Sequence, residues 1–223
     1  MKTQEFIKRE WAMWLLILIP TLFSIVNWNV FPDKIPTHWG VDGQIDSYGG
    51  KWSVFLGPLV GTGLYFLMIL IPKIDPRKKN YDLFSGAYWM IRIGLVLLMC
   101  IIGMVTDLVS LGYHLNVGLI VQLSALGLFL IMGNQMGKIR PNYFVGIRTP
   151  WTLDNEEVWT KTHRFGGKVW VGFTLALIIC VFFIPMKIFA IVFFVSIILM
   201  AIFPVVYSYV IHKKIKSQTS SNQ

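Results

Sequence analysis

Long apolar runs alternate with short polar segments along the chain. Six runs have close to the length of about 20 mostly apolar residues that a membrane-spanning helix needs: residues 11–30, 52–71, 88–110, 117–136, 169–185 and 188–211. Backbone polar groups find no water in the lipid interior, so such runs must be helical. The pattern predicts an all-α polytopic membrane protein in which residues 1–216 form one membrane domain and residues 217–223 form a disordered tail.

The cationic residues between these runs predict the orientation of the chain, because cytoplasmic segments retain lysine and arginine. The two tails and the segments 72–87 and 137–168 hold 16 of these residues, and the alternating segments hold three. We therefore expect both termini in the cytoplasm and residues 31–51 as the one sizeable outer loop. The first run is too long for a signal peptide and lacks a cleavage site, which predicts an uncleaved anchor. Arg92 lies inside the third run, and we expect its side chain to extend to the cytoplasmic interface.

Composition supports the membrane class. The chain is 55% hydrophobic and 14% charged, whereas a soluble domain carries about 25% charged residues. A net charge of +9 could indicate nucleic-acid binding, but the cations are not clustered on one soluble module. Anionic headgroups of the inner leaflet account for them better, so we expect no nucleic-acid partner. Both cysteines lie in apolar runs without metal-binding spacing, and we expect neither a metal nor a cofactor.

The segment 137–168 is a polar island between the fourth and fifth runs. Asp154 can cap a helix with Glu157 three residues later, and the glycine pair Gly166-Gly167 can end it. At 100° per residue, apolar side chains share one arc and charged side chains the other. The pattern predicts a short amphipathic helix on the cytoplasmic membrane surface, with Trp151 and Trp159 suited to the headgroup layer.

Arg148, Thr149 and Pro150 precede this expected helix. Proline restricts Thr149 to an extended conformation, which would hold the guanidinium of Arg148 in one direction. Such a group can bind a phosphate, a carboxylate or a partner protein. The alternative is an ordinary lipid-facing cation, or a side chain that packs the loop against the helices.

The outer loop 31–51 is rich in proline and glycine, which predicts ordered turns rather than helix. We expect a folded lid with Trp39 packed inward. His38, Asp42 and Asp46 could bind a cation, but the spacing of a calcium loop fails beyond two positions. Trp39 and the nearby acids could instead form a docking face for a cationic or amphipathic peptide.

Asp107 lies several residues inside the outer end of the third run. Ionisable residues within a membrane are costly and face the bundle interior or water. The sequence leaves two readings open. Asp107 is either a proton or ligand site, or it reaches the outer interface and bonds to Tyr113 or His114.

No nucleophile or phosphate-loop motif is present. Glu156, Glu157 and His163 carry groups that can perform acid–base chemistry. The two glutamates, however, fall on the solvent-facing arc of the expected helix. We expect that the protein is not an enzyme.

Two motifs resemble known families. The segment "GKIRPNYFVGIRTPWTLDNEEVWTKTHRFGGK", residues 137–168, closely resembles the signature of the SdpI family of immunity proteins. The segment "IPTHWGVDGQID" with the later Lys51 resembles an N-terminal module of many bacterial membrane proteins of unknown role. The resemblance implies a protein of the cytoplasmic membrane that protects a Gram-positive producer from a secreted peptide toxin. The founding member is also regarded as a sensor that, with toxin bound outside, holds a transcriptional repressor at the inner membrane face.

On this basis we expect two sites. The expected toxin-binding residues on the outer side are His38, Trp39, Asp42, Asp46 and Asp107. The signature-matching residues expected to bind a cytoplasmic partner are Arg148, Thr149, Pro150, Trp151, Trp159, Thr162 and His163. The alternatives are a small transporter or lipid-handling protein that uses Asp107 and Arg92, and an enzyme that acts on lipid headgroups through His163 and Glu156.

Overall fold

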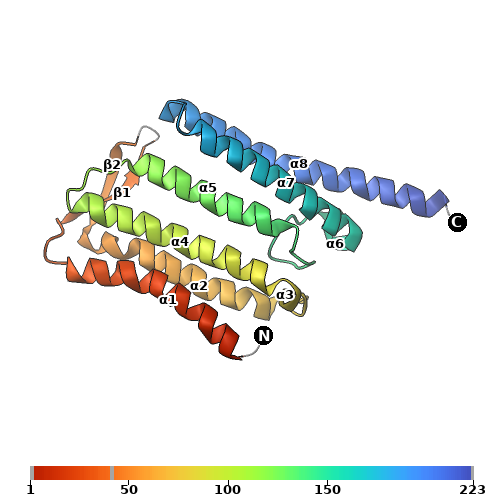
Figure 1. Cartoon of the computed structure of the whole chain (residues 1–223), viewed down its shortest axis with the longest axis horizontal. Coiled ribbons are helices and arrows are strands. Elements are labelled where there is room, and N and C mark those ends of the chain that lie inside the picture. Colours follow the sequence, from red (N-terminus) through yellow and green to blue (C-terminus); the bar gives the residue numbers. More distant parts are fainter. Residues whose placement is uncertain (1–2, 41–42, 222–223) are drawn as a thin grey trace. The chain divides into compact units, whose positions relative to one another are not determined.

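The computed structural model describes the backbone of residues 3–40 and 43–221 and the side chains of residues 10–40 and 43–218. Most of this part of the chain is helical (Figure 1). The elements in chain order are α1 (Thr3–Val26), β1 (Lys34–Trp39), β2 (Ile45–Gly50), a 3-10 turn η1 (Lys51–Phe55), α2 (Leu56–Ile74), α3 (Asn80–Leu83), α4 (Ser85–Ser110), α5 (Val117–Met136), α6 (Pro150–Asp154), α7 (Glu156–Cys180) and α8 (Met186–Ser221).

Four helical segments in the described chain are long and apolar enough to cross a membrane: Lys51–Ile74, Ser85–Ser110, Val117–Met136 and Met186–Gln218. They coincide with four of the predicted runs, and the chain is a membrane protein. The apolar part of α1, Glu10–Val26, is shorter. In α7 the apolar part begins after Lys168 and the helix ends at Cys180, which is short of a full crossing. The count of six spans stays a prediction.

The start of α7 differs from the expected cap. Asn155, rather than Asp154, is the N-cap, because its side chain accepts hydrogen bonds from the backbone N–H groups of Glu157 and Val158 at 2.9 and 3.0 Å. The expected capping role of Asp154 is therefore wrong by one residue. Glu157 instead forms a 2.6 Å ion pair with Lys161 one turn later, the spacing at which such pairs stabilise a helix.

Gly166 and Gly167 lie inside α7 and do not end it. A Cβ atom at Gly166 would come within 2.7 Å of the Ile147 side chain, and one at Gly167 within 2.7 Å of the Gly133 carbonyl oxygen. The two glycines therefore permit close packing, which outweighs their low helix propensity. The prediction of a separate amphipathic helix on the membrane surface is wrong, because that segment is the first part of a longer helix.

The segment 31–51 contains an antiparallel hairpin, so the chain is not entirely helical. Pairing runs from Lys34 opposite Gly50 to Trp39 opposite Ile45, with an irregular register on either side of His38. The sequence predicted ordered turns here and missed the strands. The proline at the third paired position, Pro36, and the glycines of β2 weaken the alternation that identifies a strand.

The chain forms two compact units. Unit 1 comprises Met1–Met68, Arg92–Leu128 and Phe183–Ala190, and unit 2 comprises Ile69–Ile91, Phe129–Phe182 and Ile191–Gln223. Helices α2, α4, α5 and α8 contribute residues to both.

A buried ion pair joins α1 and α4 within unit 1. The two terminal nitrogens of Arg92 donate to the two carboxylate oxygens of Glu10 at 3.0 and 2.9 Å, and both side chains are buried. The guanidinium also lies 5.5 Å from the ring centre of Tyr65. The expectation that Arg92 extends to the interface is wrong, because a buried carboxylate neutralises it among the helices.

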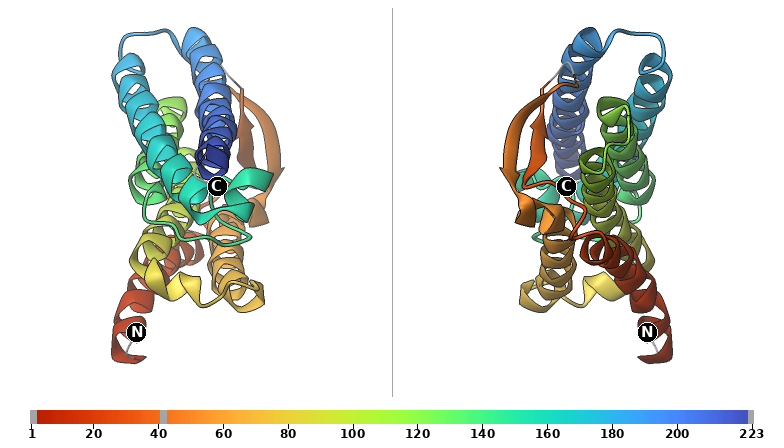
Figure 2. Two further views of the ribbon diagram at one scale, coloured as in Figure 1. Left: turned by 90° about the vertical axis from the view of Figure 1, so that its right-hand side faces the viewer. Right: turned by 90° about the vertical axis from the view of Figure 1, so that its left-hand side faces the viewer.

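In unit 2, α7 and α8 lie alongside each other (Figure 2). The indole N–H of Trp170 donates to the carbonyl of Met200 at 3.0 Å, and the rings of Phe165 and Tyr207 stack at 4.2 Å. Helix α8 continues to Ser221, whereas the composition predicts disorder from residue 217.

Candidate functional site

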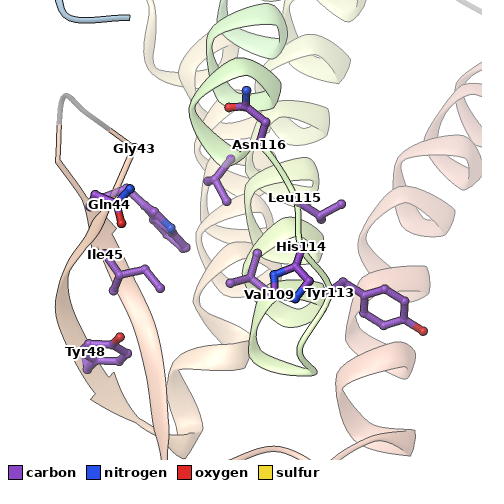
Figure 3. Close-up of a pocket in the computed structure, with 11 residues that line it drawn as sticks. Gly43, Gln44, Ile45, Tyr48, Val109, Tyr113, His114, Leu115 and Asn116 are labelled. Carbon is purple, nitrogen blue, oxygen red and sulfur yellow. The ribbon is translucent and has the colours of Figure 1, made fainter.

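An open groove with a cavity volume of about 640 Å³ lies in unit 1 between the hairpin and the α4–α5 turn (Figure 3). The hairpin supplies one wall: Trp39, Gly43, Gln44, Ile45 and Tyr48. The end of α4, the turn and the start of α5 supply the other: Val109, Tyr113, His114, Leu115, Asn116 and Val117. Among the lining residues that the structure describes there is one histidine, His114, and no carboxylate.

The hairpin wall packs against a hydrophobic cluster. Phe31, Ile35 and Val54 are almost fully buried, and the partly buried side chains packed against them are Phe23, Trp28, Phe55 and Leu111. The ring of Trp28 lies 4.8 Å from that of Trp52. The packing fixes the base of the hairpin, so the position of this wall follows from buried apolar contact.

The opposite wall is fixed by a helix end and a helix start. Gly112, with φ +91°, ends α4: its N–H donates to Val109, and the next N–H, of Tyr113, donates to Leu108. This bonding pattern is the Schellman motif, for which glycine is favoured. Asn116 then caps α5 through a 3.1 Å bond from the Leu119 N–H to its side-chain oxygen. In Figure 3 the Tyr113 ring points away from the hairpin.

The structure separates the residues expected at the outer site. Trp39 lines the groove. His38 and Asp46 form an exposed pair on the hairpin, 2.6 Å apart, and neither lines the groove. Asp42 lies outside the described residues.

Asp107 is buried among the helices of unit 1 and is not a lining residue of the groove. One carboxylate oxygen accepts a 2.5 Å hydrogen bond from the Ser24 hydroxyl. The other is buried and has no hydrogen-bond partner among the described residues. The sequence left two interpretations of Asp107 open. The expected hydrogen bond to Tyr113 or His114 is wrong, because Ser24 of α1 supplies the partner.

In unit 2 the loop 137–149, called the signature loop below, is held by buried side chains. Asn142 is fully buried. Its side-chain oxygen accepts the N–H groups of Phe144 and Val145 at 2.9 and 2.6 Å, and its amide donates to the carbonyls of Arg140 and Val145 at 2.9 Å each. The Asn142 side chain thereby supplies the hydrogen-bond partners that backbone groups would otherwise find in regular secondary structure.

Asp75 ties the same loop to the α2–α3 connection. This buried carboxylate accepts hydrogen bonds from the Tyr81 hydroxyl at 3.0 Å and from the Tyr143 and Arg77 N–H groups at 2.9 and 2.7 Å. Two effects raise the pKa of Tyr81 far above its usual range: burial, which is the larger, and the hydrogen bond to Asp75. Tyr81 therefore stays a neutral donor at all ordinary pH values.

The first turns of α7 hold the far end of the signature loop. The indole N–H of Trp159 donates to the Ile139 carbonyl at 2.8 Å. His163 accepts the Ile147 N–H at Nε2 (2.9 Å), while its Nδ1 bonds to the Trp159 carbonyl (2.8 Å). Nδ1 must carry the proton to bond a carbonyl, so the ring is in one neutral tautomer. Burial lowers the pKa of His163 to about 4.

The partner-binding residues expected from the sequence divide by exposure. Four are buried: Thr149, Trp159, Thr162 and His163. Thr149 caps α6 by accepting the Thr152 N–H, and Trp151 is only partly exposed. Arg148 and Pro150 are exposed. Thr149 also bonds to Ser208 of α8 at 3.0 Å.

The exposed part of the signature loop is aromatic and basic. Tyr143 and Phe144 are 41% and 38% exposed. Arg148 donates to the Tyr143 carbonyl at 2.6 Å, and Arg77 lies 5.0 Å from the centre of the Tyr143 ring.

Sequence reasoning missed several residues of both regions. For Asn142 a signal existed, because an asparagine after proline favours a side-chain-closed turn. For the groove, Gly112 and Asn116 were available as a helix stop and a helix start. The bond between Asp75 and Tyr143 spans 68 positions, and no local pattern indicates it.

The comparisons agree with the two motifs. Residues 138–208 match the model of the SdpI/YfhL protein family, and residues 15–62 match a domain of unknown function, DUF1648. The chain is 32% identical over 167 residues to Immunity protein SdpI of Bacillus subtilis (strain 168). The aligned residues cover 74% of this chain and 78% of that protein. No solved structure matches. Because the similarity extends over most of both chains, this protein belongs to the SdpI/YfhL family.

Proposed function

We propose that this chain is a membrane immunity protein that protects the cell producing it from a secreted peptide toxin. The observation that carries the proposal is the identity of 32% to Immunity protein SdpI, across 78% of that relative. The matched family segment 138–208 includes the hydrogen-bonded signature loop. The hairpin wall of the groove belongs to the other matched segment, 15–62.

In this proposal the groove faces the outside of the cytoplasmic membrane of a Gram-positive bacterium. The sorting of lysine and arginine supports this orientation, since the segments around the groove carry few of them. A secreted toxin would then reach the groove without crossing the membrane.

The lining favours an amphipathic peptide over a purely cationic one. Trp39 and Ile45 offer apolar contact, and Gln44 and Asn116 offer neutral hydrogen-bonding groups. Aromatic side chains in such hollows often carry most of the binding energy. We infer that Trp39 receives an apolar side chain of the toxin, and that the exposed His38–Asp46 pair contributes less.

The test is survival of cells exposed to a panel of secreted peptide toxins, with and without the gene. We expect protection by the wild type, and loss of protection for Trp39→Ala at an unchanged amount of membrane protein. Ser47→Ala is the matched control, because Ser47 is exposed on the same hairpin outside the groove lining. Equal survival with and without the gene against every toxin would reject the proposal.

The finer part of the proposal is that toxin binding alters a cytoplasmic surface that holds a repressor protein. The exposed aromatic and basic residues of the signature loop, Tyr143, Phe144 and Arg148, are the available contact groups. Such signalling requires that the toxin and the repressor each prefer one of two arrangements of the protein. Capture of a repressor by wild-type protein but not by Phe144→Ser tests this part, and toxin-independent capture would contradict it.

A small transporter is the second candidate, and Asp107 is the observation that favours it. Asp107 is a buried carboxylate, and one of its oxygens has no hydrogen-bond partner in the described part of the chain. Such a group can exchange a proton within a membrane. Asp107→Asn keeps the shape but cannot ionise. Loss of proton-coupled uptake with immunity retained would support transport, whereas loss of immunity alone would count against it.

A further inference from the structure

A crevice in unit 2 has no role in the function proposed above. It has a cavity volume of about 350 Å³ and lies among α4, α5 and α7. Its lining residues are Met90, Leu130, Ile131, Asn134, Gln135 and Val171. Four of these are apolar, and the two amides follow one another at the end of α5. The crevice is therefore apolar over most of its length and polar at one end.

Cations gather at that polar end. Lys138 follows the last turn of α5 and donates to the side-chain oxygen of Gln135 at 2.9 Å. On α7, Arg164 and Lys168 precede Val171 by seven and three residues, which places all three on one helix face. The Arg164 side chain passes close to α5, because a Cβ atom at Gly137 would lie 3.5 Å from its Cγ.

None of these three cations is neutralised by a carboxylate among the residues whose side chains are described. All three are exposed. Lys161, one turn before the group on α7, shows the contrast, because it is paired with Glu157 at 2.6 Å. The positive charge beside the crevice thus remains available to an anion.

The length of the crevice suits a chain-like ligand. From Leu130 to Met136, the last residue of α5, the helix advances by roughly 9 Å. A ligand that fills this space needs an apolar tail and an anionic head at one end. Basic pockets between membrane helices bind the headgroups of acidic phospholipids for this reason.

We propose that the crevice of α4, α5 and α7 is a binding site for one anionic phospholipid. An acyl chain lies along Met90, Leu130 and Ile131, and the phosphate meets Lys138, Arg164 and Lys168. Neutral phospholipids fit the apolar part but gain nothing from the cations.

Native mass spectrometry of the purified full chain with added phosphatidylglycerol or phosphatidylcholine tests the site. One cation near an anionic surface changes affinity by about five-fold, so the variant K138Q/R164Q/K168Q should lose roughly 100-fold for phosphatidylglycerol. The control K78Q/K79Q/K213Q removes the same charge from exposed lysines outside the lining and should bind like the wild type.

A second variant tests the apolar part. Ile131→Trp fills the crevice without changing charge, and it should lower retention of both lipids. Excess inorganic phosphate should not displace phosphatidylglycerol, because phosphate alone lacks the acyl contacts. The site is refuted by an absence of preference for phosphatidylglycerol, by equal losses in the two triple variants, or by displacement with inorganic phosphate.

Discussion

The buried polar side chains that hold the signature loop bond to its backbone groups more than to one another. Asn142, Asp75, Trp159 and His163 together bond to N–H and carbonyl groups from residue 139 to residue 147. A buried backbone group without a partner costs about as much as a lost hydrogen bond. Each of these side chains therefore stabilises one conformation of a segment that has no regular secondary structure.

His163 makes this stabilisation dependent on pH. Burial holds its pKa near 4 in the folded protein, below the usual value of about 6.5 in an unfolded chain. The contribution of the neutral ring is complete above pH 6.5 and is lost as the pH falls towards 4, a change of roughly 3 kcal/mol. We expect thermal unfolding of the purified protein to show this loss between pH 7 and pH 4.

The variant His163→Gln should be less stable at pH 7 and should lack this part of the pH dependence. His38→Gln is the control for the general effect of the substitution, because His38 is exposed and its replacement should lower stability at pH 7 less than His163→Gln. Identical pH profiles for the wild type and His163→Gln would contradict the assignment.

At the scale of elements, glycines and a buried ion pair set how the helices of unit 1 pack. A Cβ atom at Gly57 of α2 would lie 2.5 Å from the Cα atom of Gly103 of α4. Gly61, one turn later, also faces α4 at Cys100. Small residues at this spacing allow backbones in a membrane to approach closely.

Gly57→Val should force α2 and α4 apart, because its side chain would meet backbone atoms that cannot move aside. We expect a clear fall in the unfolding temperature of the purified protein. Gly63→Val is the control, since a Cβ atom there has open space around it. Equal stability of the two variants would show that the contact between Gly57 and Gly103 is unimportant.

Glu10→Gln should leave the charge of Arg92 buried without a counter-charge. Loss of one partner of a buried ion pair costs about 3–5 kcal/mol, which unfolding in detergent can measure. The double variant Glu10→Gln/Arg92→Gln should recover part of this loss, since it removes the isolated charge. A double variant less stable than Glu10→Gln alone would contradict this account.

At the scale of the whole molecule, the distribution of charge decides which segments face the cytoplasm. The predicted orientation places the hairpin outside and the start of α7 inside. In a chain with Cys100 and Cys180 replaced by alanine, a membrane-impermeant maleimide on intact cells should label Ser47→Cys and not Glu156→Cys. Both positions are exposed in the structure. Labelling of Glu156→Cys in intact cells would reverse the orientation and remove the basis for a toxin site in the groove.

The sequence by itself determined the helices that are long and apolar, because that pattern is local and the lipid interior permits few alternatives. The same holds for family membership, which two contiguous motifs indicate. The family signature did not disclose that Thr162 and His163 face inward, since helical periodicity shows which residues share a face but not what covers it.

Only the tertiary structure decided the contacts between distant positions. The bonds from Ser24 to Asp107 and from Glu10 to Arg92 join residues more than 80 positions apart. The groove likewise needs the hairpin and the α4–α5 turn to face each other, and α7 continues through two glycines because its neighbours pack against them. Each depends on the free energy of burying particular groups together, which no local pattern of residues contains.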